Sequence, residues 1–342
     1  MQAKAVGLYQ GLPISDPASL QDVTIAVAQP TGRDVLVAVA ATSVNPIDTK
    51  QRQVQAETDT PRVLGFDAVG KVLAVGDQVT SVMVDDVVYY AGAVNRPGSD
   101  AEYQLVDERL VALAPQKWSA AQSAGVPLTA LTAWEALFEK LPLKADRQAN
   151  LGQTVLIING AGGVGSIAIQ LAKWAGLTVI TTAGKPATID WVKQLGADVV
   201  LDYHADLDQQ LQAAGYSGVD HAIIFHSTDL YLPLVTPLVK PLGTIVAVVT
   251  NQQPLPMDLL KAKSLNFAWE FMFTKANYQL PAMATQGMIL ARVAALANQG
   301  FIKPTTKRVI EGINATNLKT AHQLVESGQM LGKVVLTAPF NA

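Results

Sequence analysis

Glycines in the segment INGAGGVG, residues 158–165, have the spacing of a phosphate-binding bend. Gly160, Gly162 and Gly165 satisfy the pattern G-x-G-x-x-G. The apolar run TVLII precedes them and a stretch with helical spacing of apolar residues follows, which is the context in which this pattern indicates a dinucleotide site. In such a bend the first glycine permits a tight turn, the second lets the backbone reach a pyrophosphate, and the third lets helix and strand pack closely. We therefore predict dinucleotide binding here.

The helix that follows the bend would complement the charge of a phosphate. Its first turn contains Gly163 and Val164. Backbone N–H groups at a helix start have no partner within the helix, and the helix dipole adds positive potential, so both favour an anion. A glycine-rich hairpin or a close helix crossing is the structural alternative for the same letters.

The type of dinucleotide depends on the residues after the second strand of this unit. Enzymes that use NAD place an acid there to accept hydrogen bonds from the ribose hydroxyls, but no acid occurs from Ser166 to Ile189. Gly184 would instead leave space for a 2′-phosphate, Lys185 would supply positive charge, and Tyr203 would form a third wall. These residues predict NADPH as the cofactor. The alternative is that Lys185 is an ordinary surface lysine and Tyr203 a core or rim residue.

The whole-chain composition indicates a folded enzyme with two domains. The chain has 342 residues, of which 49% are hydrophobic and 15% charged, with a net charge of −3 and no cysteine. The sequence contains no run of basic residues of the kind that indicates a nucleic-acid partner. The uncharged segment 148–172 is interrupted by asparagine, glutamine and glycine, which argues against a membrane span, and the N-terminus lacks the apolar core of a signal peptide. We expect a soluble cytoplasmic protein without disulfides or thiolate metal sites.

Two kinds of element would position these residues. The first 115 residues contain short β-branched stretches separated by turn residues, which predict an antiparallel, barrel-like β domain without a long helix. The predicted strands lie in DVLVAVAATSVN, DAVGKVLAVG, DVVYYAG, AEYQLV and LVALAP.

From residue 154 onward, apolar strands alternate with helices, which is typical of a parallel sheet covered on both faces. The predicted strands are TVLIIN, LTVITT, VVLDY, HAIIFHS, GTIVAVV and NFAWEFM, and the predicted helices lie at about 164–175, 187–195, 205–214 and 229–239. The later segments break this rhythm, so we expect them to return to the first domain. They are a helix at about 281–299, TKRVIEG, a helix near 316–327 and KVVLTA.

The chain resembles the medium-chain dehydrogenases/reductases of the quinone oxidoreductase type, in the branch of zinc-type alcohol dehydrogenase-like proteins. The resemblance rests on SVNPIDTK, LGFDAVGKVLAVG, YYAGAVNRPGSDAEYQLVDER, PLTALTAWEALFE, INGAGGVGSIAIQLAK, WEFMFT and GKVVL. It implies an α/β protein with a GroES-like β-rich catalytic domain over 1–123, completed by 273–342, and a Rossmann domain over 124–272. It also implies a substrate cleft where the two domains meet, and a homodimer.

Three site residues follow from this resemblance. Asn45 and Asp48 match the N-x-x-D of zinc-free quinone reductases, where the loop borders the nicotinamide and the substrate. An amide there could hydrogen-bond a substrate carbonyl. Thr132 matches a threonine that contacts the nicotinamide end of the cofactor. The alternatives are that Asn45 caps a turn before Pro46 and that Thr132 is a hydroxyl at a helix N-terminus.

The chain departs from its zinc-dependent relatives at the metal site. Those relatives use two cysteines and a His-Glu pair in a G-H-E segment, where this chain has Asn45 and Gly65-Phe66-Asp67. None of the four histidines lies in these loops, so we predict no metal and expect Asp67 only to structure its loop.

Without a Lewis acid, the expected substrate is a quinone or an α,β-unsaturated carbonyl, which accepts hydride by spreading the charge through conjugation. The alternatives are an alcohol dehydrogenase with a divergent metal site, and a non-catalytic NADPH-binding sensor or interaction protein.

Overall fold

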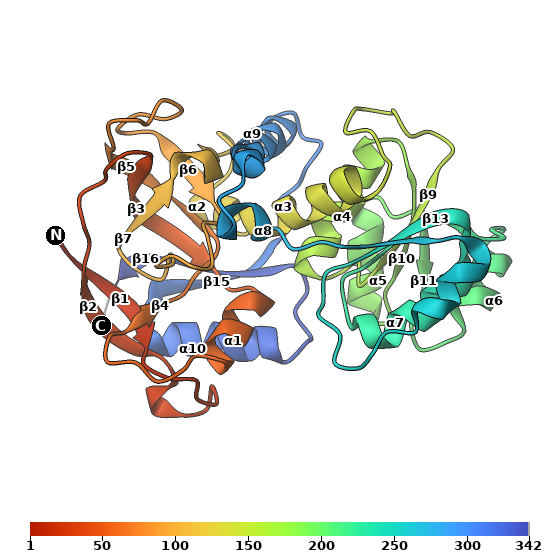
Figure 1. Cartoon of the computed structure of the whole chain (residues 1–342), viewed down its shortest axis with the longest axis horizontal. Helices are drawn as coiled ribbons and strands as arrows, with labels where there is room; N and C mark the ends of the chain where they lie inside the picture. Colours follow the sequence, from red (N-terminus) through yellow and green to blue (C-terminus); the bar gives the residue numbers. More distant parts are fainter. Residues whose placement is uncertain (341–342) are drawn as a thin grey trace. The chain divides into compact units, whose positions relative to one another are not determined.

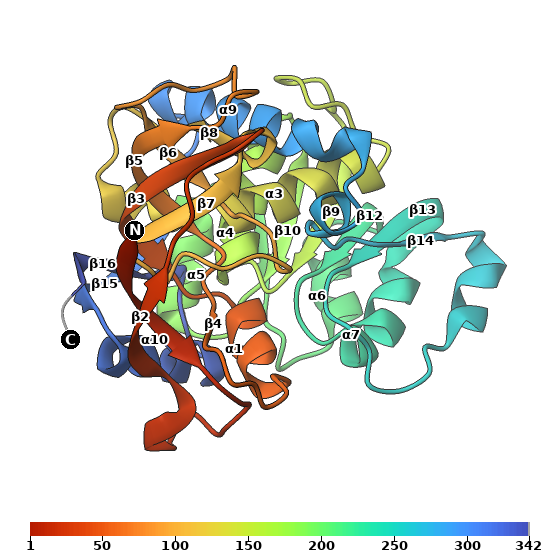
Figure 2. The same cartoon turned by 60° about the vertical axis from the view of Figure 1, so that its left-hand side comes forward.

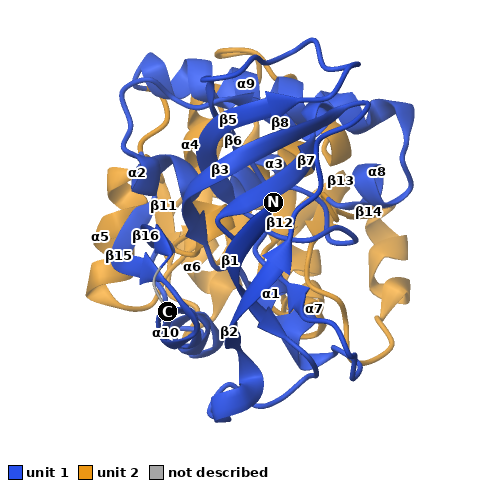
Figure 3. Cartoon of the chain, turned by 90° about the vertical axis from the view of Figure 1, so that its left-hand side faces the viewer, with its two compact units in different colours: residues 1–131, 273–300, 304–342 blue, residues 132–272, 301–303 orange. Residues whose placement is uncertain are grey.

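The computed structural model describes residues 1–340 and divides into two compact units (Figure 3). Unit 1 contains Met1–Leu131, Phe273–Gly300 and Pro304–Ala342, and unit 2 contains Thr132–Met272 and Phe301–Lys303. The first division falls within helix α3 (Pro127–Glu135), a few residues after the 123/124 boundary expected from the sequence.

Unit 2 is built on a six-stranded parallel sheet (Figure 1). Its spatial order is β11-β10-β9-β12-β13-β14, which is the 3-2-1-4-5-6 order of a dinucleotide-binding fold. The strands are β9 (Thr154–Ile158), β10 (Thr178–Thr182), β11 (Val199–Leu201), β12 (Val219–Ile224), β13 (Val239–Ala247) and β14 (Asn266–Trp269). Every residue of β9 is buried, as expected for a central strand covered on both faces. The predicted Rossmann architecture is confirmed.

The helices of unit 2 follow the predicted rhythm. They are α4 (Gly163–Trp174), α5 (Pro186–Gln194), α6 (Leu207–Ala213) and α7 (Thr228–Val235). The predicted helix at 229–239 ends earlier, because a short 3₁₀ turn, Thr236–Leu238, leads directly into β13. The apolar faces of α6 and α7 share one core with the sheet, formed by Leu156, Ile158, Ile180, Leu211, Ala222, Leu232 and Ile245 among others.

Unit 1 contains two further sheets. A seven-stranded sheet has the order β15-β16-β3-β5-β6-β8, with β7 also paired to β3, and a three-stranded sheet has the order β2-β1-β4. The strands are β1 (Gln2–Leu8), β2 (Gln21–Ala26), β3 (Asp34–Ser43), β4 (Arg62–Val63), β5 (Ala68–Val75), β6 (Val87–Tyr90), β7 (Tyr103–Asp107), β8 (Val111–Leu113), β15 (Thr306–Ile313) and β16 (Lys333–Phe340). All pairs are antiparallel except β15 with β16. Strand β16 lies directly against β3, with Val335 opposite Ser43.

Two short helices of unit 1, at 46–53 and 274–277, were not predicted from the sequence. The helices of this unit are α1 (Pro46–Gln53), α2 (Ala120–Ala124), α8 (Thr274–Asn277), α9 (Ala284–Asn298) and α10 (Ala315–Glu326), while α3 begins in it. The sequence predicted no long helix in the N-terminal domain, and the eight-residue α1 was not among its predicted elements. This helix begins at Pro46, where the fixed φ of proline is favourable, and the Asp48 carboxylate accepts the backbone N–H of the N-cap Asn45 at 2.7 Å.

Within the residues that the structure describes, no helix combines the length and the apolar character needed to cross a membrane.

A buried histidine lies between two helices of unit 1. Helices α1 and α10 lie side by side in Figures 1 and 2. His322 of α10 is fully buried, and within residues 1–340 neither ring nitrogen has a hydrogen-bond partner. Burial, with a smaller contribution from the Arg52 guanidinium, lowers the pKa of His322 from 6.5 to about 3. The folded protein therefore holds this ring neutral, whereas the unfolded chain can protonate it.

This difference predicts a pH-dependent stability. Between pH 6.5 and 3 the unfolded chain binds a proton at His322 that the folded chain does not, so stability is lost as the pH falls through this window. The contribution is at most about 1.4 kcal/mol per pH unit. Urea unfolding at several pH values should show a shallower pH dependence for His322→Leu than for the wild type between pH 4 and 6. Parallel curves would contradict the assignment.

Candidate functional site

The glycine bend of unit 2 turns on an asparagine. Asn159, directly after β9, has φ +66°, and its carbonyl accepts the N–H of Gly162 at 3.3 Å. The Thr182 hydroxyl fixes it further by accepting the Asn159 N–H at 2.9 Å. The sequence assigned the tight turn to Gly160, and this detail was wrong. Asn159 adopts the left-handed conformation, which asparagine tolerates better than most residues.

Glycine is required at the three positions of the bend for different physical reasons. A Cβ atom at Gly160 would lie 2.0 Å from the Thr181 hydroxyl oxygen, and one at Gly165 would lie 2.3 Å from the Asn159 carbonyl oxygen. These two glycines are therefore required by packing within unit 2. A Cβ at Gly162 would approach only the side chain of Asn159, at 3.0 Å, so the chain's own packing demands this glycine least. The open side of Gly162 fits a ligand that approaches the backbone.

Helix α4 begins at the bend with free donors. Gly162 is its N-cap, and Gly163 and Val164 form its first turn, half-buried. Among the described residues, no acceptor contacts the N–H groups of Gly163 and Val164. With a glycine-lined approach and a twelve-residue helix behind it, this turn can hold a phosphate.

The residues after β10 pack closely against those after β11. A Cβ at Gly184 would lie 2.7 Å from the His204 ring and 2.8 Å from the Tyr203 ring, so aromatic atoms fill the space that a side chain would take. Glycine is needed here because the chain after β11 packs against it. The contact of Gly184 with a phosphate stays a prediction. Lys185 is the N-cap of α5 and is exposed, and no carboxylate pairs with it among the described residues.

The structure adds two residues that sequence analysis missed at this end of the sheet. Asp202 and His204 flank Tyr203 after β11, and the His204 Nδ1 lies 2.8 Å from an Asp202 carboxylate oxygen. The sequence pattern of NAD-binding folds places the acid at the end of the second strand, whereas Asp202 follows the third. Tyr203 itself is 40% exposed, and its ring lies 4.3 Å from that of His204 between centroids.

Thr132 is the sixth residue of α3 and is buried. It is therefore not at the helix N-terminus, which removes the alternative reading of its hydroxyl. Its contact with a nicotinamide stays a prediction.

Unit 1 contains a buried carboxylate with an unusually complete set of donors. Asp67 precedes β5, and its side chain is fully shielded from solvent. One oxygen accepts the Leu128 N–H at 2.7 Å; the other accepts the Ser43 hydroxyl and the Asn45 amide, each at 2.8 Å. A fourth donor, the Lys333 ammonium, lies 3.2 Å from this second oxygen.

Lys333 is a buried cation that sequence analysis did not identify. It is the first residue of β16, and its side chain is 4% exposed. Its ammonium donates to the Val44 carbonyl at 3.1 Å, to the Asn45 side-chain oxygen and to Asp67. These three acceptors match the three N–H bonds of an ammonium. Burial lowers the pKa of Lys333 and raises the pKa of Asp67, so each needs the other to remain charged.

The two predicted catalytic residues belong to this cluster. Asn45 is buried and bridges Asp67 and Lys333 through its amide. The Asp48 carboxylate, also buried, accepts the N–H groups of Asn45 at 2.7 Å and Gly65 at 3.1 Å. Burial raises the pKa of Asp48 to about 7, although the Asn45 N–H opposes this shift. These contacts give both residues a role in organising the loop, and direct contact with a substrate stays a prediction.

The donor set of the cluster does not suit zinc. The position after Gly65 is Phe66, whose ring packs on Phe273 at 5.4 Å between centroids and offers no ligand atom. The oxygens of Asn45 and Asp67 are already bound to an ammonium. Within residues 1–340, no group of three histidine, aspartate or glutamate side chains is arranged to hold a metal ion. A zinc ion here would have to displace Lys333.

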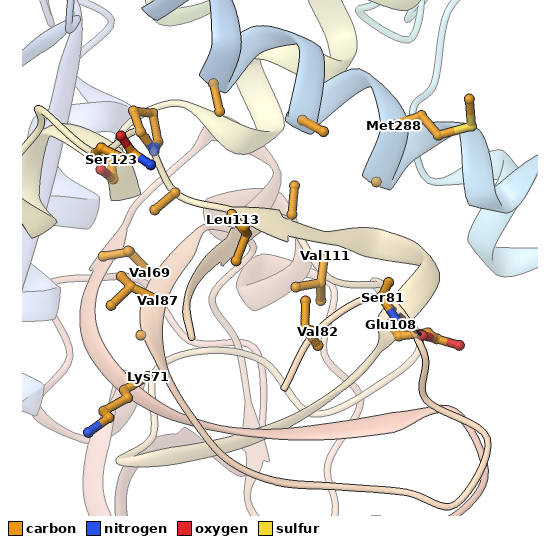
Figure 4. Close-up of a pocket in the computed structure, with 18 of the residues that line it drawn as sticks. Val69, Lys71, Ser81, Val82, Val87, Glu108, Val111, Leu113, Ser123 and Met288 are labelled. Carbon is orange, nitrogen blue, oxygen red and sulfur yellow. Dashed lines mark hydrogen bonds between the residues drawn. The ribbon is translucent and has the colours of Figure 1, made fainter. Parts of the chain in front are cut away.

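A separate groove of about 1130 Å³ lies within unit 1, between α9 and the sheet edge at β8 (Figure 4). Small apolar residues form most of its walls, including Val69, Val111 and Leu113, with Met288 at one end. Its acid, Glu108, is paired with Arg33. None of the predicted site residues lines this groove.

Comparison with known families matches both parts of the chain. The model of the alcohol dehydrogenase GroES-like domain matches residues 31–116, and that of the zinc-binding dehydrogenases matches residues 163–285. A zinc-type alcohol dehydrogenase-like protein of Staphylococcus epidermidis is 42% identical over 97% of this chain and 99% of its own length. The structure of a proposed zinc-dependent alcohol dehydrogenase of Rhizobium etli has a TM-score of 0.94 and 40% identity, covering 100% of this chain and 99% of its own.

More distant relatives carry other activities in their names. An NADPH-dependent alkenal/one oxidoreductase of Arabidopsis thaliana is 38% identical over 49% of this chain and 45% of its own length. The quinone oxidoreductase of Coxiella burnetii is 28% identical with a TM-score of 0.81, covering 99% of this chain and 100% of its own. A mycobacterial protein solved with NADPH is 26% identical with a TM-score of 0.83, covering 98% and 100%.

The buried ion pair makes a prediction about stability. Lys333→Met leaves the Asp67 carboxylate buried without its counterion and should lower the free energy of unfolding by about 3–5 kcal/mol. The double variant Lys333→Met/Asp67→Asn should lose much less stability in total than the sum of the losses of the two single variants, measured by urea unfolding at pH 7. The exposed pair Lys71 and Asp85 is the matched control, where Lys71→Met should cost less than about 1 kcal/mol. Additive effects at Lys333 and Asp67 would show that the pair is not coupled.

Proposed function

Because the chain belongs to the medium-chain dehydrogenase/reductase superfamily, in its branch of zinc-type alcohol dehydrogenase-like proteins, we propose that this oxidoreductase is a zinc-independent enzyme that transfers hydride from NADPH to a quinone or an α,β-unsaturated carbonyl. The observation that carries the proposal is the Lys333 ammonium bound to Asn45 and Asp67.

The ammonium supports zinc independence through its chemistry. Lys333 supplies positive charge to the loops in which the zinc-dependent relatives place their ligands, but all three of its N–H bonds are used by Val44, Asn45 and Asp67. It therefore has no open position with which to polarise a substrate carbonyl, unlike a catalytic zinc. An enzyme built in this way suits acceptors that need no Lewis acid.

The preference for conjugated acceptors follows from the same point. NADPH supplies the hydride when it is bound. Quinones and enones spread the resulting negative charge through conjugation, whereas an unactivated carbonyl concentrates it on one oxygen. The alkenal/one oxidoreductase and quinone oxidoreductase relatives support this substrate class.

NADPH fits the residues of unit 2. The first turn of α4, at Gly163 and Val164, can hold the pyrophosphate, with Gly162 leaving room for its approach. Lys185 is exposed and not paired with a carboxylate among the described residues, so it is available to a 2′-phosphate, with Tyr203 nearby. The mycobacterial relative solved with NADPH supports this choice.

Steady-state assays and metal analysis test the proposed activity. The purified protein should oxidise NADPH in the presence of quinones and enals, much more slowly with simple aldehydes, and with NADPH preferred to NADH. Activity should survive chelators, and elemental analysis should find no stoichiometric zinc. Zinc at one per chain together with activity lost to a chelator would favour the alcohol dehydrogenase alternative. NADPH binding without turnover of any acceptor would favour a sensor.

We also propose that the protein forms a homodimer through β14. This strand is the end of the six-stranded sheet, and within the described residues it pairs only with β13. An unpaired edge is a template for a second strand. Trp269, the last residue of β14, and Phe271, just after it, are 43% and 46% exposed. Sheet continuation between two copies would cover both features.

Sedimentation at micromolar concentration should show a dimer. The double variant Trp269→Glu/Phe271→Glu should shift it to monomer, because like charges would face each other across the edge. Leu151→Glu, at a 68% exposed apolar position before β9, is the control and should remain dimeric. A wild-type monomer would refute the proposal.

A further inference from the structure

A carboxylate borders the coenzyme end of unit 2 although the second strand ends without one. Strands β10 and β11 are parallel neighbours that end level with each other, with Thr182 opposite Leu201. The Ala183 N–H donates to the Leu201 carbonyl at 3.0 Å just beyond the strands. Asp202 therefore leaves the sheet at the same edge as Gly184. This is the edge at which an NAD-binding fold places its ribose-binding acid.

Asp202 is held firmly and is charged. Its backbone N–H donates to the Gln210 side-chain oxygen at 2.8 Å, and its carbonyl accepts the Gln210 amide at 2.9 Å. One Asp202 carboxylate oxygen accepts the backbone N–H of His204 at 3.0 Å and lies 2.8 Å from Nδ1 of the His204 ring. These two hydrogen bonds lower the pKa of Asp202, so the group is a carboxylate at neutral pH.

The His204 ring is fixed over the backbone at Gly184. A Cβ added to Gly184 would lie 2.7 Å from the His204 Cε1 atom, so only glycine allows this approach. The Tyr203 ring supports His204 from its own loop at 4.3 Å between centroids. Nδ1 faces Asp202, while the His204 side chain is 61% exposed, which leaves Nε2 for a second partner.

We propose that His204 sets the coenzyme preference by screening Asp202 and donating from Nε2 to the 2′-phosphate of NADPH when the ring is protonated. The inference rests on the proposed use of NADPH. An unscreened Asp202 would repel the phosphate and would accept hydrogen bonds from the free ribose hydroxyls of NADH. Histidine can change its charge between pH 5 and 8, so the preference becomes pH-dependent.

The neighbouring charges act on this ring in opposite directions. The Asp202 carboxylate and a bound phosphate would attract a positively charged ring, whereas Lys185, from the loop after β10, would repel it. Burial raises the pKa of Tyr231 of α7, which interacts with Tyr203 in the loop after β11, so the Tyr231 ring adds no charge here. NADPH binding should therefore take up a proton at His204 near neutral pH, and NADH binding should not.

Coenzyme titrations of the full-length protein between pH 6 and 8.5 test the proposal. His204→Gln keeps a hydrogen bond to Asp202 without the charge. It should weaken NADPH about tenfold at pH 6.5 and leave NADH unchanged or tighter. Adding Asp202→Asn should recover most of the loss for NADPH and cancel any gain for NADH. Calorimetry in buffers of different ionisation enthalpy should show that NADPH binding to the wild type takes up protons. In His204→Gln only the proton exchange that comes from ionisation of the 2′-phosphate should remain.

Lys185→Ala serves as the matched control, because it should weaken NADPH at all these pH values and leave the proton uptake in place. A His204→Gln variant with the wild-type NADPH/NADH ratio and pH dependence would overturn the role of His204 while leaving the proposed function intact. A double variant as weak for NADPH as His204→Gln alone would overturn the role of Asp202. If the wild type prefers NADH at every pH and Lys185→Ala changes nothing, the use of NADPH itself is wrong.

Discussion

A buried ammonium ion beside a buried carboxylate is the contact on which the interior of unit 1 depends. Neither charge is tolerable there alone, because removing an ion from water costs several kcal/mol that only a close partner and full hydrogen bonding can offset. Lys333 and Asp67 meet both conditions. Through them β16, the loop after β3 and the start of β5 are held at one point.

The same contact is the basis of the proposal that this enzyme works without zinc. A catalytic metal ion keeps one coordination position open for water or substrate. A lysine is part of the chain, and here all three N–H donors of its ammonium are bound to protein acceptors. Lys333 therefore places positive charge in the loop but has no free N–H bond with which to polarise a substrate carbonyl. On the proposed function, the acceptor then has to stabilise its own developing charge.

Local patterns in the sequence predicted much of the fold. The glycine bend and the alternation of apolar strands with helices were sufficient for the architecture of unit 2, because both signals lie within short windows. Helix α1 was missed, since its eight residues show no long apolar period and its start is set by Pro46 and Asp48. The role of Asn159 was assigned to Gly160, because a pattern of glycines does not show which backbone turns left-handed.

Contacts between residues far apart in the chain could not be predicted from local sequence patterns. Lys333 lies 266 residues from Asp67, and the only local trace of its role is a lysine at the start of an apolar strand. Asp202 was overlooked because the expected acid belongs to the second strand, and the register of β10 with β11 is needed to see that the third strand reaches the same place.

The position of Lys333 in the chain has a consequence for biosynthesis. Unit 2 is almost continuous in sequence, whereas unit 1 is assembled from three segments, and its internal cation belongs to the last of them. Since 266 residues separate Asp67 from Lys333, synthesis at about 5–20 residues per second leaves the carboxylate without its counterion for on the order of 10–50 s. During that interval burial of Asp67 is unfavourable, so the nascent N-terminal segment keeps it hydrated. Unit 2 can therefore fold first, whereas the core of unit 1 around Asp67 can fold only after Lys333 has been synthesised.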